Sequence, residues 1–342
     1  MNSQTIQAFI GIDIAADHFT ASAFFNPNQA IITKNLITND PEGFQTLIDW
    51  LTSHHCNPKS SIFCMEATGV YGEKLAYFLL AQGYQVAVEP PLQVKRAFHP
   101  SKEKTDAVDS QQIAQYAFRF LDQLHFFSPK EEILEKIKTL LNLREQFVLQ
   151  RSANLASQKQ LKKAFFHQAE AITHLKQAIE SHSQQIQSIE KQIQDLIDQN
   201  PDYKNKVNLL KSIPGVGMLL ASQLLAMTQG FQKQIHYKQA ASYLGISPKR
   251  FESGSSIRRK PTSSGFGPST LRKLLYLASM SLRTHNKNFK LYYLRKMAEG
   301  KPPKVILNNI ANKLLKIIFA VTKNQKRFNQ NYCSINPMLL NY

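Results

Sequence analysis

The chain has 342 residues, an ordinary apolar content and a formal net charge of +18. Its three cysteines, an odd number without metal-ligand spacing, argue against a disulfide framework and against a zinc site. No window of about 18 residues is apolar throughout and no signal-peptide pattern begins the chain, so we expect a cytoplasmic protein without a membrane span.

The positive charge is concentrated in the last part of the chain. Residues 1–100 contain 5 Lys or Arg against 8 Asp or Glu, residues 101–200 contain 13 of each, and residues 201–342 contain 24 against 3. An asymmetry of this size indicates a polyanionic partner, most simply nucleic acid. The alternative is a basic surface that only aids solubility.

The first predicted element is an apolar strand that contains one acid. Residues 9–15 read F-I-G-I-D-I-A, which is typical of a strand buried on both faces, where an unpaired carboxylate is costly. Residues 18–25 and 30–38 also have extended patterns. A ribonuclease-H-like sheet begins with three such strands, and its first-strand acid holds Mg²⁺. For Asp13, a strand-end turn or cap is an equally good interpretation of this stretch alone.

Helices and strands alternate after these three strands. We expect a helix at 41–53, a strand at 61–65 that ends at Glu66, a helix at 71–82, a strand at 85–89 and a helix at 105–120. This order predicts an α/β domain of the ribonuclease H type, with helices covering the sheet.

Three further acids fall where this fold would bring ligands close to Asp13. Glu66 ends a strand, and open α/β sheets bind ligands at the carboxyl ends of their strands. Asp106 and Asp109 start a helix and share one of its faces, although first-turn acids are also favoured by the helix dipole alone. Oxygen ligands without His or Cys indicate Mg²⁺ or Mn²⁺. Two such ions about 4 Å apart support phosphodiester chemistry.

Residues 129–199 have the pattern of long helices. They contain one proline, at the start, and no glycine. Two seven-residue series run through the second half: Ile172, Ile179, Ile186 and Ile193, and Leu175, His182, Ile189 and Leu196. The series predict a helical hairpin or coiled coil that dimerises, in which His182 sets the register. The alternative is a helix packed within its own subunit.

Two later stretches suggest contacts with phosphates. Residues 213–217 resemble a helix-hairpin-helix turn, in which Gly215 and Gly217 let backbone N–H groups reach a phosphate, and a plain helix-helix turn explains them equally well. Residues 243–272 are rich in Ser, Gly and cations and predict an exposed loop between helices. Spacing alone favours a phosphate-binding loop there over a serine nucleophile. The cations that we expect to bind nucleic acid are Lys102, Lys104, Lys249, Arg250, Arg258, Arg259, Lys260 and Arg272.

Seven motifs occur in a fixed order between residues 8 and 325. They are GIDIA at 11–15, MEATGVY at 65–71, KTDAVD at 104–109, SIPGVG at 212–217, LGISPKRFESG at 244–254, LRKLLYLASM at 271–280 and GKPPKV at 300–305. In this order they resemble the DEDD-type insertion-sequence transposases related to the Piv and MooV DNA invertases.

The resemblance implies a domain organisation and a set of site residues. The domains would be a RuvC-like (ribonuclease H fold) domain at 1–127, a helical coiled-coil connector for dimerisation at 128–203, a helical domain with a serine loop at 204–328 and a tail at 329–342. In the family, four acids bind Mg²⁺, here Asp13, Glu66, Asp106 and Asp109.

The family also uses a serine that attacks DNA and becomes covalently linked to it. That serine precedes a glycine and follows a proline by five residues, which here gives Ser253, between Pro248 and Gly254. Ser255 and Ser256 lie close enough to be alternatives for this serine, and Ser255-Ser256-Ile257-Arg258 replaces the family's usual glycine-and-lysine continuation.

The resemblance further implies the partners. These are DNA at the element junction and at the target, a structured guide (bridge) RNA that pairs with both, and a homodimer that becomes a tetramer in the assembled complex, in the bacterial cytoplasm at the nucleoid. The alternatives are a RuvC-like metal-dependent nuclease or resolvase that uses water, and a non-catalytic nucleic-acid-binding derivative. An actin-like phosphotransferase would need Gly-rich phosphate loops, which the sequence lacks.

Overall fold

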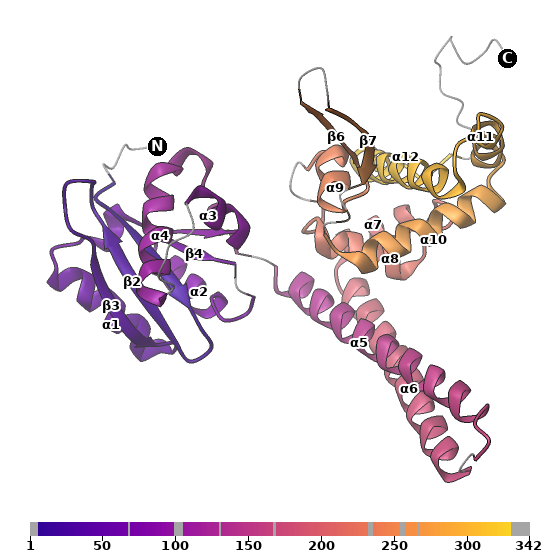
Figure 1. Cartoon of the computed structure of the whole chain (residues 1–342), viewed down its shortest axis with the longest axis horizontal. Coiled ribbons are helices and arrows are strands. Elements are labelled where there is room, and N and C mark those ends of the chain that lie inside the picture. The colour runs from indigo at the N-terminus through magenta and orange to yellow at the C-terminus, as the bar shows by residue number, and fades with distance from the viewer. Residues whose placement is uncertain are drawn as a thin grey trace. The chain divides into compact units, whose positions relative to one another are not determined.

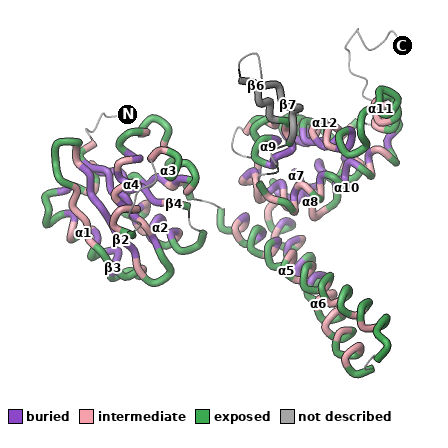
Figure 2. The backbone as a smooth tube through the Cα atoms, viewed as in Figure 1, coloured by how far each residue is buried: buried purple, intermediate pink, exposed green. Residues whose placement is uncertain are grey.

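The computed structural model describes residues 6–67, 69–98, 105–129, 131–166, 169–231, 235–253, 257–263, 265 and 267–329, with the backbone alone at 249–253 and 257–262. The chain separates into two compact units, Met1–Pro129 and Lys130–Tyr342 (Figure 1). Each unit has its own hydrophobic core, and Figure 2 shows the buried residues gathered within each of them.

The first unit is a five-stranded mixed sheet in the order β3-β2-β1-β4-β5. The central strand β1 pairs antiparallel with β2 and parallel with β4, so the sheet combines an antiparallel meander with a parallel half. This confirms the predicted α/β unit ahead of a helical region. The strands are β1 (Ala8–Ile14), β2 (His18–Phe24), β3 (Ile32–Thr38), β4 (Ser61–Glu66) and β5 (Gln85–Glu89).

Helices cover both faces of this sheet. One face packs against α1 (Pro41–Ser53) and α2 (Glu73–Ala81), and the other against α3 (Pro91–Ala97) and α4 (Asp106–Arg119). Two short 3₁₀ turns, η1 (Pro58–Ser60) and η2 (Leu121–Gln123), complete the unit. Ile10 and Ile12 of β1 face α1 and α2, so by strand alternation Gly11 and Asp13 lie on the α4 face.

Gly11 allows α4 to lie directly on β1. A Cβ atom at this position would be 2.1 Å from the Ser110 carbonyl oxygen and 2.2 Å from the Ala114 nitrogen. Beside this contact, the hydroxyls of Ser22 and Ser110 share a buried hydrogen bond of 2.7 Å. The contact fixes the height of α4 above the sheet, and with it the position of the two acids in the first turn of α4.

We expect Gly11→Ala to destabilise the first unit by about 3 kcal/mol, because the new methyl group meets helix backbone that cannot rotate away. Urea denaturation of the full chain, followed by circular dichroism, measures the effect. Gly72→Ala is the matched control, since a Cβ there would lie 3.3 Å from the Met65 sulfur, at the far end of a flexible side chain, and in ordinary contact with Ile14 carbons at 3.9 Å. Equal urea midpoints for Gly11→Ala and the wild type would contradict the contact.

The second unit is built from helices around one core. Its elements are α5 (Glu132–Leu161), α6 (Ala169–Asp198), α7 (Pro201–Lys211), α8 (Met218–Met227), α9 (Tyr237–Tyr243), β6 (Pro248–Ser253), β7 (Ile257–Ser263), α10 (Ser269–His285), α11 (Lys287–Ala298) and α12 (Pro303–Asn324). Leu134 of α5 and Ile193 of α6 belong to the same buried cluster as α7 to α12. The predicted division of this part at residues 203 and 204 therefore stays a prediction.

The helical hairpin predicted before residue 200 is present as α5 and α6 (Figure 1). The heptad series packs against α5 of the same chain, with Ile186, Ile189 and Ile193 buried. The Arg144 Nε donates to Glu190 Oε1 at 2.7 Å, and the His182 ring packs on Phe147. Packing within one chain thus accounts for the buried part of the seam, and dimerisation stays a prediction.

The prediction of a loop between residues 243 and 272 was wrong in part. Residues 248–253 and 257–263 form the antiparallel hairpin β6–β7, in which Ser253 pairs with Ile257. The two strands pair only with each other. Because a two-stranded hairpin of polar residues does not need an apolar face, it lacks the alternating pattern by which strands are recognised in a sequence.

Helix α12 is the one segment in the described part of the chain that is long and apolar enough to span a membrane. Half of its most apolar window is buried inside the unit, where Ile306, Ile310 and Leu314 join the core. A core helix meets the same criteria of length and composition, so this helix is weak evidence for a membrane segment.

Candidate functional site

The four predicted acids come together at one end of the sheet. Asp13 is the penultimate residue of β1, Glu66 ends the adjacent strand β4, and Asp106 and Asp109 lie in the first turn of α4. The Thr105 hydroxyl accepts a hydrogen bond from the Val108 N–H and caps this turn. Strand pairing and the contact of α4 with β1 therefore position all four carboxylates.

Burial and repulsion within this acid cluster (Asp13, Glu66, Asp106 and Asp109) both act on Asp13. Its pKa is raised from 3.8 to about 6, first by burial and then by the charges of Asp109, Asp106 and Glu66. Burial also raises the pKa of Glu66, while the Lys95 ammonium on α3 opposes that shift and Asp109 adds to it. The cluster thus carries excess negative charge beside the Lys95 ammonium, which the sequence did not single out.

The donor set of the acid cluster fits a hard divalent cation. All four donors are carboxylates, which Mg²⁺ and Mn²⁺ prefer, and a bound cation would relieve the repulsion that raises the pKa of Asp13. Over the described residues, however, no three Asp, Glu, His or Cys side chains are close enough to form a coordination sphere. The carboxylates are neighbours in the described arrangement without converging on one point.

Ser253 is the last residue of β6, and its backbone is the part that the structure describes. The neighbouring Gly254, Ser255 and Ser256 lie outside the described residues, as do the predicted nucleic-acid contacts Lys102 and Lys104. Five more predicted contacts lie on the hairpin strands with described backbone alone: Lys249, Arg250, Arg258, Arg259 and Lys260.

Side chains of α10 and α12 hold both ends of the segment that carries the hairpin. Arg272 Nη1 donates to the carbonyl oxygens of Leu244 (3.2 Å) and Gly267 (2.9 Å), which lie on either side of the hairpin. Asn308 and Asn312 both donate to the Ile246 carbonyl oxygen, at 2.9 and 3.1 Å. These three side chains form a clamp on the hairpin. The sequence placed Arg272 among the nucleic-acid contacts and did not single out the asparagines.

The two glycines of the predicted phosphate-binding turn differ in their surroundings. Gly215 has a positive φ of 83°, and a Cβ there would lie 2.7 Å from the Ala278 carbonyl oxygen of α10. Close packing against α10 is therefore enough to explain why residue 215 is a glycine. Gly217 is the N-cap of α8 and has open space where a Cβ would be, so its surroundings leave room for a ligand.

A basic and aromatic face lies on α9, α11 and α12 of the second unit. Lys313 Nζ lies 4.9 Å from the centre of the Tyr292 ring, Arg295 stacks on the same ring, and Lys316 lies over Tyr237. Partial burial lowers the pKa of Lys313, and the positive charges of Lys316, Arg295 and Lys296 lower it further. We call this set of crowded cations the tyrosine-lysine face. The sequence analysis did not single out these residues.

Comparison with known proteins agrees with this arrangement. A transposase domain of the DEDD IS110 type matches residues 10–166, and a domain described as "Transposase IS116/IS110/IS902 family" matches residues 207–294. These matches, together with the similar gene-inverting proteins, indicate a DNA recombinase. The chain belongs to the IS110 family of transposases.

Similar curated proteins include two pilin gene-inverting proteins. Those of Moraxella bovis and Moraxella lacunata are 29% and 28% identical over 337 and 336 residues, which cover 95% of this chain and 98% of theirs. An uncharacterized 43.6 kDa protein of insertion element IS110 from Streptomyces coelicolor is 28% identical over 115 residues, 34% of this chain and 28% of that protein.

Proposed function

We propose that this transposase cuts and rejoins DNA through a covalent link between Ser253 and the DNA, that its acid cluster holds Mg²⁺ or Mn²⁺, and that a structured RNA selects the sites. The observation that carries the proposal is the placement of Asp13 and Glu66 at the carboxyl ends of the paired strands β1 and β4, with Asp106 and Asp109 in the first turn of α4. The order of the strands around β1 favours a RuvC-like, ribonuclease H fold for the first unit.

Each half of the chain has its own part in the proposed reaction. The four carboxylates hold the cation, which would stabilise negative charge at the scissile phosphate when bound. The Ser253 oxygen attacks phosphorus, the bond to the 3′ oxygen breaks, and the serine proton leaves as the 3′-OH takes one up. In rejoining, a 3′-OH attacks the phosphoserine ester and releases the serine. The cations of β6 and β7 would stabilise the charged transition state.

A denaturing gel tests the proposed function directly. The full chain is incubated with Mg²⁺, a labelled DNA that contains the element junction, and RNA transcribed from the non-coding DNA next to the gene. We expect a labelled protein–DNA adduct and a free 3′-OH end, and no product in EDTA. A nuclease or resolvase that uses water would give hydrolysed ends and no adduct, which would overturn the serine mechanism.

The assembly also follows from the proposed function. We propose a homodimer that forms a tetramer on DNA, with the acid cluster of one subunit acting beside the serine of another. Cleavage would then wait for assembly, and broken ends would stay within one complex. Leu149 and Leu155 of the α5–α6 hairpin are exposed and are available for contacts between subunits.

The tyrosine-lysine face supports the nucleic-acid part of the proposal. Residues 269–324, which form α10 to α12, contain twelve Lys or Arg and one acid, Glu299, which pairs with Lys296. Crowding like charges is unfavourable unless a polyanion neutralises them. The Tyr292 and Tyr237 rings hold three of these cations in place, so less side-chain freedom is lost on binding.

We expect Lys313→Gln/Lys316→Gln to weaken DNA binding and to reduce the slope of log K against log salt by about 2, because each phosphate-bound lysine contributes about 1. Fluorescence anisotropy at several salt concentrations measures the slope. The control is Lys136→Gln/Lys138→Gln, which removes the same charge from lysines paired with acids on α5. Equal slopes for both double variants would exclude the face as a phosphate site.

A further inference from the structure

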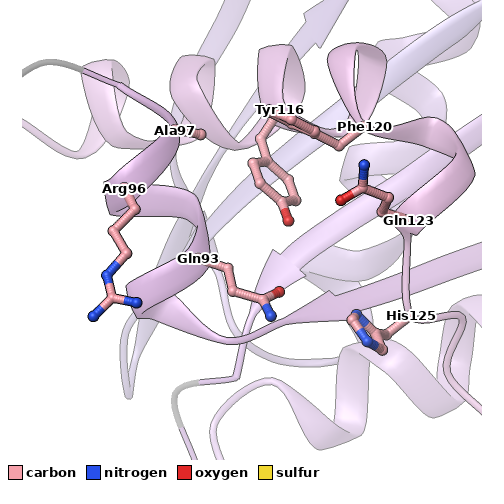
Figure 3. A pocket seen from close by; sticks show the side chains of 7 residues that line it. All are labelled: Gln93, Arg96, Ala97, Tyr116, Phe120, Gln123 and His125. Carbon is pink, nitrogen blue, oxygen red and sulfur yellow. The ribbon is translucent and has the colours of Figure 1, made fainter. Parts of the chain in front are cut away.

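A pocket of about 330 Å³ lies in the first unit, beside the C-terminal end of α4 (Figure 3). It has no part in the proposed chemistry. Side chains from α3, α4, η2 and the segment after η2 surround it, and Figure 3 shows several of their polar groups facing a common space. The side chains that matter here are Gln93, Arg96, Tyr116, Phe120, Gln123 and His125.

A buried acid fixes one wall of the pocket. Glu89 at the end of β5 is fully buried, and it accepts hydrogen bonds from the His125 backbone N–H at 2.6 Å and from His125 Nδ1 at 3.0 Å. The Val88 N–H donates to the His125 carbonyl oxygen at 3.0 Å, which ties this segment to the sheet. Because a carboxylate only accepts, Nδ1 carries the proton, and Nε2 of the mostly exposed ring is left for a ligand.

The polar groups of the pocket suit a planar heterocycle. Gln93 and Gln123 each offer an amide donor and an amide acceptor, and Tyr116 adds a hydroxyl. Phe120 is partly exposed and provides aromatic surface for stacking, and the buried Tyr116 ring supports it at 5.0 Å. Glu89 is covered, so none of the described residues that line the pocket is acidic, and Arg96 adds a positive charge. This combination recognises unpaired bases in proteins that bind single strands.

We propose that this pocket binds one unpaired nucleobase of a strand that lies in the acid cluster; the proposal rests on the proposed function. Its size is at the lower end of small-ligand sites, which run from roughly 300 to 1,000 Å³, and suits a single base.

Helix α4 sets the spacing between the pocket and the acid cluster. Tyr116 follows Asp109 by seven residues, about 10 Å along a helix, which is about three stacked nucleotides. On the α3 side, Lys95 faces Glu66 and the next residue, Arg96, lines the pocket. A strand with one phosphate at the acid cluster would therefore place a base a few nucleotides away in the pocket. The pocket would select that base and fix the register of cleavage.

An abasic-site scan tests the pocket in the full chain. In one set of complexes each DNA strand has a single abasic position, and in a second set the guide RNA has a single abasic position. The affinity of the full chain for each complex is measured in EDTA. We expect one position, in one of the two strands, to lower the affinity about tenfold, which is the effect of losing a single stacked base. The strand that shows the effect identifies the source of the base. A scan in which all positions behave alike would overturn the proposal.

Variants connect that position with the pocket. The double variant Gln93→Ala/Gln123→Ala changes two exposed residues of the pocket. We expect the abasic effect, which is the loss of affinity at the one sensitive position, to disappear in this variant while salt-dependent binding persists. The control Gln45→Ala/Gln82→Ala alters two exposed residues of α1 and the end of α2, and should keep the effect. An abasic effect retained in the pocket variant would exclude the pocket. Binding in EDTA requires no cleavage. A chain that shows the loss of affinity at one abasic position but forms no adduct in Mg²⁺ would therefore overturn the serine mechanism and leave the pocket proposal standing.

Discussion

Replacing Asp13 by asparagine should stop strand cleavage and, at neutral pH, make the first unit more stable. The substitution removes one of four carboxylates from the proposed metal site, and a catalytic metal supplies several kcal/mol of transition-state stabilisation. We therefore expect adduct formation to fall by roughly a hundredfold or more. The denaturing gel that detects the protein–DNA adduct measures this loss.

The gain in stability follows from the raised pKa of Asp13. The folded chain binds this proton more tightly than the unfolded chain does, so the free energy of unfolding decreases as the pH rises from 3.8 to about 6. Above that range Asp13 is charged, and its charge lowers the free energy of unfolding by the full amount, which we call the penalty. Allowing for solvent screening of a partly exposed group, the penalty is about 1–2 kcal/mol. Asparagine removes it, so Asp13→Asn should gain that amount at pH 7.5 and little at pH 4.

Urea denaturation in EDTA at both pH values measures the difference. Adding Mg²⁺ should then stabilise the wild type at pH 7.5 and leave Asp13→Asn almost unchanged, because ligand binding stabilises the folded state that holds the ligand. The exposed Asp17, just before β2, provides the control Asp17→Asn, which changes the charge outside the acid cluster. An Asp13→Asn protein that is less stable than the wild type at pH 7.5 would contradict repulsion in the cluster.

Replacing Ser253 by alanine should reduce the covalent adduct to background, because no other oxygen would occupy the position of the nucleophile. DNA binding should be unchanged, since one small hydroxyl contributes little to an interface dominated by phosphate charge. The matched control is Ser263→Ala, on the opposite strand of the same hairpin. The measurements are the denaturing gel for the adduct and anisotropy for binding.

The two neighbouring serines make this test sharper. If Ser255→Ala or Ser256→Ala removes the adduct and Ser253→Ala retains it, the nucleophile is assigned to the wrong residue. Ser253→Ala should also retain the stabilisation by Mg²⁺ that Asp13→Asn loses. A loss of that stabilisation in Ser253→Ala would show that the substitution disturbs more than the nucleophile.

The sequence predicted the sheet well because its strands and helices have regular patterns and clear ends. The strand-end argument that selected Glu66, however, applies equally to Glu89. Glu66 and Glu89 end neighbouring strands and are partners in the sheet register. Glu89 is fully buried and bonded to His125, whereas Glu66 is partly exposed and lies near Asp109. That difference depends on contacts with residues far along the chain, which no local pattern reveals.

The remaining features were beyond local patterns for related reasons. The clamp joins Arg272, Asn308 and Asn312 to carbonyl oxygens 5 to 66 residues away, and a backbone acceptor leaves no trace in the sequence. The heptad series is the same whether the partner helix comes from the same chain or from a second one. The polar β6–β7 hairpin lacked the alternation that would have predicted its strands.

The clamp has a consequence for how substitutions in the hairpin should be interpreted. Since Arg272, Asn308 and Asn312 hold the hairpin at its base through backbone carbonyls, the grip is independent of the side chains along β6 and β7. A substitution such as Ser253→Ala should therefore leave the supporting helices as stable as in the wild type. A loss of activity in such a variant then reports on the chemistry at the hairpin and not on unfolding of the second unit.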